Sequence, residues 1–174
     1  MNNVSIRNMD TFDCIATKLD IREYSKQKID IEIIDKILEA ARLTGTGLNT
    51  QHWRFIVVED RNNLNQLAED STSGKWVAEA KFAIIVLTNP KYKYHKIDAG
   101  RVLQSMQLAA WNFGVGSGLF TGIKEQNLRK DFNIPEEMDI TLVVGLGYPA
   151  KKNLTGKRKN RLPINELVHH EIYG

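Results

Sequence analysis

A long helical segment over residues 98–113, with apolar residues around most of its circumference, is the feature that most limits how this chain can fold. Its apolar side chains cover more than half of the helix circumference, and they are Val102, Leu103, Met106, Leu108, Ala109, Ala110 and Trp111. A helix that is apolar on most sides has to be buried on most sides. In a small domain it lies either at the centre of one subunit or between two subunits, and the pattern alone does not choose.

Three short apolar runs, rich in β-branched residues, predict buried strands at Phe55–Val58, Phe82–Leu87 and Ile140–Val144. Apolar residues at helical spacing predict further helices, expected from Asp10 to Thr17, after Asp30, after Asp60 and over Lys124–Phe132. The first of these helices is expected to bury Phe12, Ile15 and Ala16. A turn at Gly145–Pro149 is expected to end the last strand, and 174 residues fit one domain over residues 1–174.

The composition is that of an ordinary globular protein, with 42% hydrophobic and 26% charged residues and a formal net charge of +3. That charge is too small to predict a nucleic-acid or membrane partner, and no apolar run approaches the length of a membrane span. The one cysteine, Cys14, excludes an intramolecular disulfide and suits a reducing compartment, and the N-terminus has no apolar signal-peptide core. These features predict a cytoplasmic location.

Basic residues concentrate between Lys151 and Arg161, in a stretch without hydrophobic periodicity. One interpretation is a solvated basic arm, which would bind nucleic acid in a salt-sensitive way. The other is a tail that crosses to a second subunit and brings Lys159 and Arg161 onto a phosphate. Residues i and i+2 of an extended segment, such as these two, point to the same face. Lys18 and Arg22, near the first helix, are likewise either surface charges or phosphate ligands.

The stretch Thr44–Phe55 concentrates glycines and small polar residues between a predicted helix and a predicted strand. Gly45 and Gly47 allow the backbone to approach a flat ligand, because no Cβ intervenes. Asn49 and Gln51 each bring a donor and an acceptor, which suits the edge of a heterocycle. An ordinary helix-to-strand loop explains this stretch equally well.

The glycine run Gly114–Gly118 does not have the context of a dinucleotide fingerprint, because it follows a predicted helix instead of a strand. It is expected to end the helix and to lead into Leu119–Gly122. The sequence contains no Walker loop, no Gly-x-Ser-x-Gly elbow and no histidines at zinc-ligand spacing to a cysteine. Metal catalysis therefore has little support.

Four segments in order resemble motifs of the FMN-dependent nitroreductase family. Ala40–Phe55 resembles its signature of Ala-Ala-Arg, a small-residue turn and Asn-x-Gln-Pro-Trp-x-Phe. Lys18–Tyr24 resembles the N-terminal basic motif, Gly114–Gly122 the segment after the central helix, and Lys159–Pro163 the C-terminal basic motif. The matches span roughly residues 10 to 170.

The resemblance implies an α+β, three-layer fold with a mostly antiparallel sheet flanked by helices. It also implies a homodimer with a long central interface helix, and an extension from about residue 150 to 174 that crosses to the partner. FMN would bind between the subunits, take hydride from NADH or NADPH and reduce a nitroaromatic or quinone in a ping-pong cycle, with no catalytic side chain. The implied cofactor contacts are Lys18, Leu19, Asp20, Arg22, Gly45, Thr46, Gly47, Asn49, Thr121, Gly122, Lys159 and Arg161. The implied substrate contacts are Leu48 and Phe120.

Several departures from the family pattern bear on the cofactor and the substrate, and the first is Lys18, which stands where arginine is usual. Asp20 stands where serine commonly contacts the phosphate, and a carboxylate beside a phosphate is repulsive, so Asp20 is expected to bond ribityl hydroxyls or to orient a cation. Gly45-Thr46 replaces a frequent Pro-Ser, and His52 replaces the proline before Trp53. Flavin cleavage, dehalogenation and a non-catalytic flavin-binding role therefore remain as alternatives.

Overall fold

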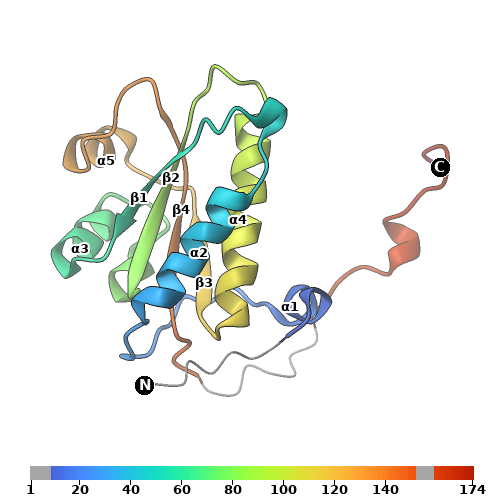
Figure 1. Cartoon of the computed structure of the whole chain (residues 1–174), viewed down its shortest axis with the longest axis horizontal. Helices are drawn as coiled ribbons and strands as arrows, with labels where there is room; N and C mark the ends of the chain where they lie inside the picture. The colour runs from blue at the N-terminus through green and yellow to red at the C-terminus, as the bar shows by residue number, and fades with distance from the viewer. Residues whose placement is uncertain (1–8, 152–158) are drawn as a thin grey trace.

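The computed structural model describes residues 9–151 and 159–174, and its centre is a four-stranded sheet (Figure 1). The strands are β1 (Arg54–Val58), β2 (Phe82–Thr88), β3 (Gly116–Phe120) and β4 (Asp139–Gly147), in the order β1-β2-β4-β3. All three neighbouring pairs are antiparallel, as predicted. The helices are α1 (Thr11–Thr17), α2 (Ile31–Leu43), α3 (Arg61–Glu69), α4 (His95–Asn112) and α5 (Glu125–Asp131). Short 3₁₀ turns are η1 (Gly47–Asn49), η2 (Lys75–Glu79) and η3 (Ile164–Glu166).

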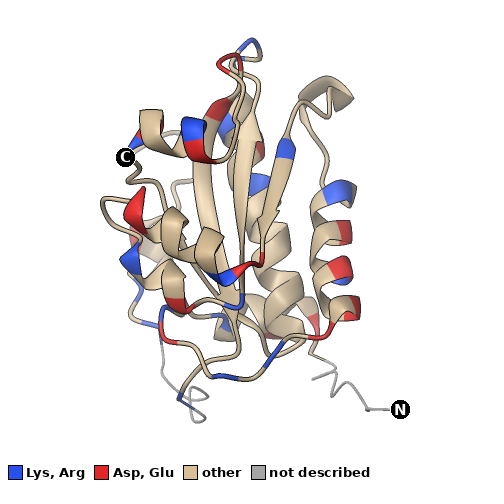
Figure 2. Ribbon diagram, turned by 90° about the vertical axis from the view of Figure 1, so that its left-hand side faces the viewer, with Lys and Arg blue, Asp and Glu red and all other residues tan. Residues whose placement is uncertain are grey.

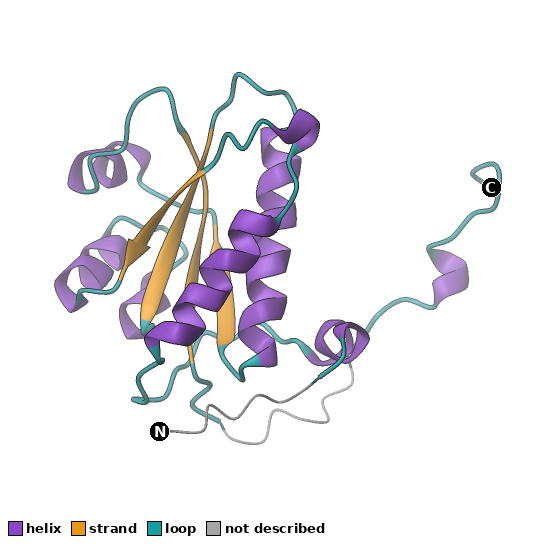
Figure 3. Cartoon of the chain, viewed as in Figure 1, coloured by secondary structure: helices purple, strands orange, loops and turns teal. Residues whose placement is uncertain are grey.

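Helices cover both faces of the sheet, which makes three layers (Figure 3). Every residue of β2 is buried, because its side chains alternate between two cores. Ile84 and Val86 join the core beneath α2 and α4, whereas Ala83 and Ile85 join the core that includes residues of α3, η2 and α5. None of the helices in residues 9–151 and 159–174 is long and apolar enough to span a bilayer.

The central helix is confirmed, and α4 begins three residues earlier than predicted, at His95. It packs on α2 and on the sheet within one subunit, and Ala99, Val102 and Met106 are fully buried there. Leu108 and Ala109 are only half-buried. The helix therefore serves the core of one subunit, and its role between two subunits stays a prediction.

The strand β3 was not predicted, because its glycine-rich sequence does not have the composition of a strand. A Cβ at Gly116 would lie 2.5 Å from Ile21, and one at Gly118 would lie 2.6 Å from the Ile21 backbone oxygen. The segment around Ile21 thus packs directly on the strand backbone, and the Ile21 amide donates to the Ser117 oxygen over 2.8 Å. The prediction that β4 ends at Val144 was also wrong, since pairing with β3 extends it to Gly147.

The buried face predicted for α1 was wrong. Asp10 caps the helix by accepting the Asp13 amide over 2.7 Å, as expected, but the buried residue is Cys14. Phe12 is 75% exposed and Ile15 is 48% exposed. The apolar residues of the C-terminal segment are also exposed, and they are Leu162, Ile164, Leu167, Val168, Ile172 and Tyr173. That segment extends away from the rest of the subunit (Figure 1), and residues 152–158 of the predicted extension lie outside the described residues.

Candidate functional site

Apart from those in and after β3, the candidate residues lie in two groups at opposite ends of α4 (Figure 1). The segment 18–22 is at the carboxyl end, where the Trp111 indole donates to the hydroxyl of the last residue of α1 over 3.0 Å. The loop Gly45–Asn49 is at the amino end, where the Gly47 amide donates to the Asp98 carboxylate over 3.0 Å. Asp98 and Trp111 are about 20 Å apart at a rise of 1.5 Å per residue. One subunit therefore does not bring the two groups together.

Cationic side chains from both ends of the chain meet beside α1. The Lys159 ammonium donates to the backbone oxygen of Ile15, 144 residues earlier. Partial burial lowers the pKa of Lys159, the charges of Arg161 and Lys18 lower it further, and Asp20 opposes them. Lys18 pairs with Asp20, with 2.6 Å between Nζ and Oδ1. We call Lys18, Lys159 and Arg161 the cation cluster, and its charge fits a phosphate group.

Arg22 extends from the same segment toward Trp76, which the sequence analysis did not single out. Its guanidinium lies over the Trp76 ring, 5.7 Å from the centroid. A cleft of about 330 Å³ opens beside it, lined by Asp20, Ile21, Arg22, Glu23, Pro149 and Lys151. Leu19 is half-buried between Lys18 and Asp20. The first motif therefore supplies Lys18 to the cation cluster and Arg22, beside two carboxylates, to the lining of this cleft.

The turn after β3 presents backbone amides. The Thr72 amide donates to the Gly122 oxygen over 2.8 Å, and a Cβ at Gly122 would lie 2.5 Å from the Ser73 hydroxyl. The amides of Thr121 and Gly122 donate to no partner within the described part of the chain. They are therefore available to an acceptor atom of a ligand, as the resemblance implies.

Phe120, expected to contact substrate, is in the core instead. Its side chain is only 4% exposed and packs edge-on against Trp76, with 5.7 Å between ring centroids. The side chain lies on the face of β3 that η2 covers, so it does not reach the surface. We therefore leave Phe120 out of the site.

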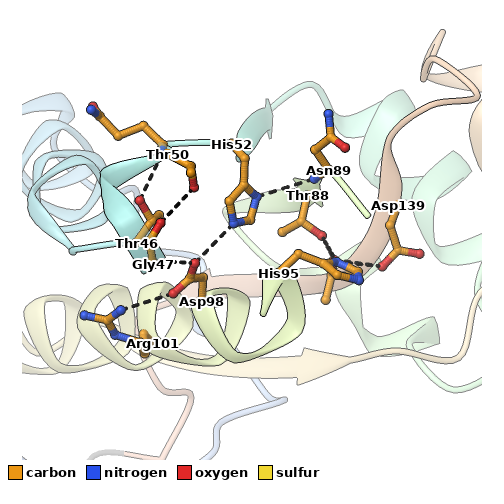
Figure 4. Close-up of polar contacts among 12 residues, drawn as sticks. Thr46, Gly47, Thr50, His52, Thr88, Asn89, His95, Asp98, Arg101 and Asp139 are labelled. Carbon is orange, nitrogen blue, oxygen red and sulfur yellow. Dashed lines mark hydrogen bonds and ion pairs between the residues drawn. The ribbon is translucent and has the colours of Figure 1, made fainter. Parts of the chain in front are cut away.

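The loop at the other end of α4 is held by the buried carboxylate of Asp98 (Figure 4). Asp98 accepts from the Gly47 amide, from His52 Nε2 over 3.2 Å and from Arg101 Nη1 over 3.1 Å. His52 Nδ1 accepts the Asn89 amide over 3.4 Å, which leaves the hydrogen on Nε2. Burial raises the pKa of Asp98, but the three hydrogen bonds outweigh burial and leave that pKa below its usual value. His52, Asp98 and Arg101 were not predicted as site residues, because only the fold brings them together.

The loop itself has a strained backbone. Leu48, Asn49 and Gln51 have φ angles of 53°, 54° and 45°, in the left-handed region that residues other than glycine rarely adopt. Thr46 holds the loop, because its oxygen accepts the Asn49 amide and its hydroxyl accepts the Gln51 amide. The Leu48 side chain is consequently 90% exposed. Strain of this kind concentrates at functional sites.

Gly47 has no room for a side chain. A Cβ there would lie 2.6 Å from the Tyr94 ring, so Gly47→Ala is expected to displace the loop and to lower the free energy of unfolding by about 2 kcal/mol. Gly100→Ala is the matched control, because its Cβ meets nothing within 4 Å and alanine is the better helix former. Thermal unfolding should show a lower Tm for the first variant and a higher Tm for the second. An unchanged Tm for Gly47→Ala would contradict the packing described here.

A buried carboxylate lies behind the Thr121–Gly122 turn. Asp70 is 2% exposed, and its backbone oxygen accepts the Lys124 amide over 2.6 Å. Gln66 Nε2 donates both to Asp70 Oδ1 over 3.3 Å and to Asp131 Oδ2 over 2.8 Å. Burial raises the pKa of Asp70, and the negative charge of Asp131 raises it further.

Asp70→Asn is therefore expected to stabilise the protein at neutral pH. A carboxyl whose folded pKa is raised loses stability as the pH rises from its ordinary pKa through the raised value. Asparagine removes this loss and keeps an oxygen that accepts from Gln66. The Tm at pH 7 should therefore rise by about 2–4 °C, equivalent to about 1 kcal/mol. The gain should shrink toward pH 4. A variant with a lower Tm at pH 7 would show that the charged form of Asp70 is stabilising.

The comparisons with known proteins agree with this fold. The model of the nitroreductase family matches residues 15–89 and 72–148. A protein of Archaeoglobus fulgidus with the provisional name NADH dehydrogenase/NAD(P)H nitroreductase is 37% identical over 145 residues, which cover 78% of this chain and 83% of that protein. A protein of the same provisional name from Methanothermobacter thermautotrophicus is 32% identical, with 84% and 81% covered.

One solved structure is also informative about ligands. It is described as a nitroreductase from Desulfovibrio desulfuricans in complex with FMN, and it superposes with a TM-score of 0.83 at 25% identity. The superposition covers 96% of this chain and 99% of that one. With the family match and the two archaeal relatives, this structure leads to one assignment: the chain belongs to the nitroreductase family.

Proposed function

We propose that this protein is an FMN-dependent oxidoreductase that takes electrons from NADH or NADPH and passes them to a nitroaromatic, a quinone or a similar acceptor. The observation that carries the proposal is the hydrogen bond from Lys159 to Ile15, which brings the C-terminal basic segment with Arg161 to the end of α1 that Lys18 follows, because such a group of cations fits the phosphate of FMN. The names of the archaeal relatives and the FMN complex of the Desulfovibrio structure support it. Use of NAD(P)H also fits the cytoplasmic location expected from the sequence.

The residues of this chain would bind the flavin and tune it. When bound, FMN supplies hydride acceptance and hydride donation in two separate half-reactions. The cation cluster holds the phosphate, and Arg22 beside the cleft stabilises negative charge on the ring. The free amides of Thr121 and Gly122 donate to acceptor atoms at the ring edge. No side chain is needed as a proton donor in this scheme.

We place the complete site between two subunits of a homodimer. A two-fold axis can bring the loop of one subunit onto the cation cluster of its partner. The two groups, which lie at opposite ends of α4 within one subunit, would then meet between subunits. The exposed Leu48 would then face the partner's flavin, where it contacts the substrate as predicted. The exposed apolar residues of α1 and of the C-terminal segment would be covered in the same association.

The first test is a visible absorption spectrum of the purified protein before and after anaerobic addition of NADH or NADPH. We expect an oxidised-flavin spectrum that bleaches, and the rates rank the two donors. A flavin spectrum that neither donor bleaches would indicate a flavin-binding protein without this activity. A colourless protein that takes up no added FMN would contradict the proposal.

Subunit mixing tests whether the site is shared. Lys159→Ala/Arg161→Ala damages the cation cluster, and Gly47→Ala displaces the loop, so neither homodimer should bind FMN well. A mixed dimer has one site with both defects and one intact site, so equal mixing should restore about one quarter of the sites. Failure of mixing to restore binding, with mixed dimers demonstrated by mass, would mean that each subunit binds FMN alone.

A further inference from the structure

The cation cluster contains a carboxylate of the chain itself. Asp20 Oδ1 lies 2.6 Å from Lys18 Nζ, and the Lys18 side chain is only 14% exposed whereas that of Asp20 is 55% exposed. The charge of Asp20 also raises the pKa of Lys159, whereas the charges of Arg161 and Lys18 lower that pKa. One anionic side chain therefore faces two of the three cations expected to hold a phosphate.

A carboxylate at this position competes with a phosphate in two ways. Its oxygen already accepts one of the three hydrogens that the Lys18 ammonium could donate to the ligand. The three cations Lys18, Lys159 and Arg161 carry a total charge of +3, and Asp20 lowers the local total to +2. The carboxylate also repels the phosphate dianion directly. The pairing also answers the question that the sequence raised, because Asp20 does orient a cation.

We propose that Asp20 is an internal competitor for the FMN phosphate, so that this protein holds FMN loosely and exchanges it with flavin in solution. This inference rests on the proposed function and identifies what sets flavin retention in that site. The inference also predicts an effect on the choice between flavins, because Asp20 competes only with the phosphate group. Asp20 therefore reduces the preference of the site for FMN over riboflavin, which lacks the phosphate, and removal of its charge should increase that preference.

The test compares dissociation constants of FMN and riboflavin for the wild type and Asp20→Asn, measured by titration of flavin fluorescence. Asparagine removes the charge and keeps the shape, and the exposure of Asp20 makes a folding defect unexpected. We expect the FMN Kd to fall about tenfold or more and the riboflavin Kd to stay within about twofold. The variant should also retain more FMN after desalting.

Asp35→Asn is the matched control, because it makes the same change of charge on the exposed face of α2, which carries both acidic and basic residues (Figure 2). It should leave both Kd values unchanged. An equal gain for riboflavin, or an FMN Kd that is unchanged or weaker in Asp20→Asn, would overturn the inference while FMN binding by the wild type upholds the proposed function. Absence of FMN binding by the wild type and both variants would overturn both.

Discussion

Replacing Lys159 and Arg161 together by alanine is expected to weaken FMN binding at least 100-fold without lowering the Tm of the flavin-free protein. Each side chain is placed to make a charge-assisted hydrogen bond worth about 1.5–3 kcal/mol, so losing both removes about 3–6 kcal/mol of binding. Stability should not change, because Arg161 is exposed and Lys159 contacts the rest of the subunit through a surface hydrogen bond to Ile15. Equilibrium titration with FMN and thermal unfolding measure the two effects.

The control for this variant is Lys91→Ala/Lys93→Ala, which removes two exposed lysines near the other end of α4. It changes the net charge by the same amount as Lys159→Ala/Arg161→Ala, and its FMN Kd should stay within about twofold of the wild-type value. Stoichiometric FMN in purified Lys159→Ala/Arg161→Ala would show that the phosphate binds elsewhere. Equal weakening in both variants would mean that overall charge, and not the cation cluster, attracts the ligand.

Replacing Asp98 by alanine is expected to lower the free energy of unfolding by about 3 kcal/mol. The change leaves the half-buried Gly47 amide and the buried His52 Nε2 without their acceptor, and it frees the strained loop. For a chain of this size, the Tm should fall by about 6–12 °C. Arg101→Ala is the comparison, because Arg101 is half-exposed and its loss should cost about 1 kcal/mol or less.

The Asp98 effect should depend on pH. A carboxyl whose folded pKa is lowered contributes stability above its ordinary pKa, and that contribution is lost as the pH falls through the folded value. The difference in Tm between the wild type and Asp98→Ala should therefore be largest near neutral pH and smaller in acid. If the wild type and Asp98→Ala differed in Tm by the same amount at pH 7 and pH 3.5, the charge of Asp98 would contribute nothing to stability. Asp98→Ala and Arg101→Ala with equal Tm values would contradict its place as the acceptor that holds the loop.

The elements with strong local patterns could be predicted from the sequence. The helix after Asp30 and the strand Phe82–Leu87 formed as expected, because apolar periodicity and β-branched runs report which residues are buried. β3 could not be predicted, since its glycines are required by the packing of Ile21 and Trp76 on its backbone. The face of α1 was assigned wrongly because periodicity does not say whether another element covers a helix.

The candidate site was predictable only as a list of residues. The resemblance identified the basic motifs and the loop, but it did not reveal that Asp20 pairs with Lys18 or that Phe120 is buried. The contacts of Asp98 with Gly47 and His52 join residues 46 or more positions apart, and sequence periodicity carries no information about such pairs. The roles of the named residues toward FMN stay predictions until the variants are measured.

The contact between Lys159 and Ile15 has a consequence for biosynthesis. A ribosome makes the segment that carries Lys18 first and the one that carries Lys159 only after the whole sheet has been translated. The nascent chain can therefore complete the sheet before it carries Lys159 and Arg161, two of the three cations expected to bind the phosphate. On the proposed function, cleavage ahead of residue 159 would likewise remove two of the three cations expected to bind the phosphate, so FMN binding would report that this segment is present.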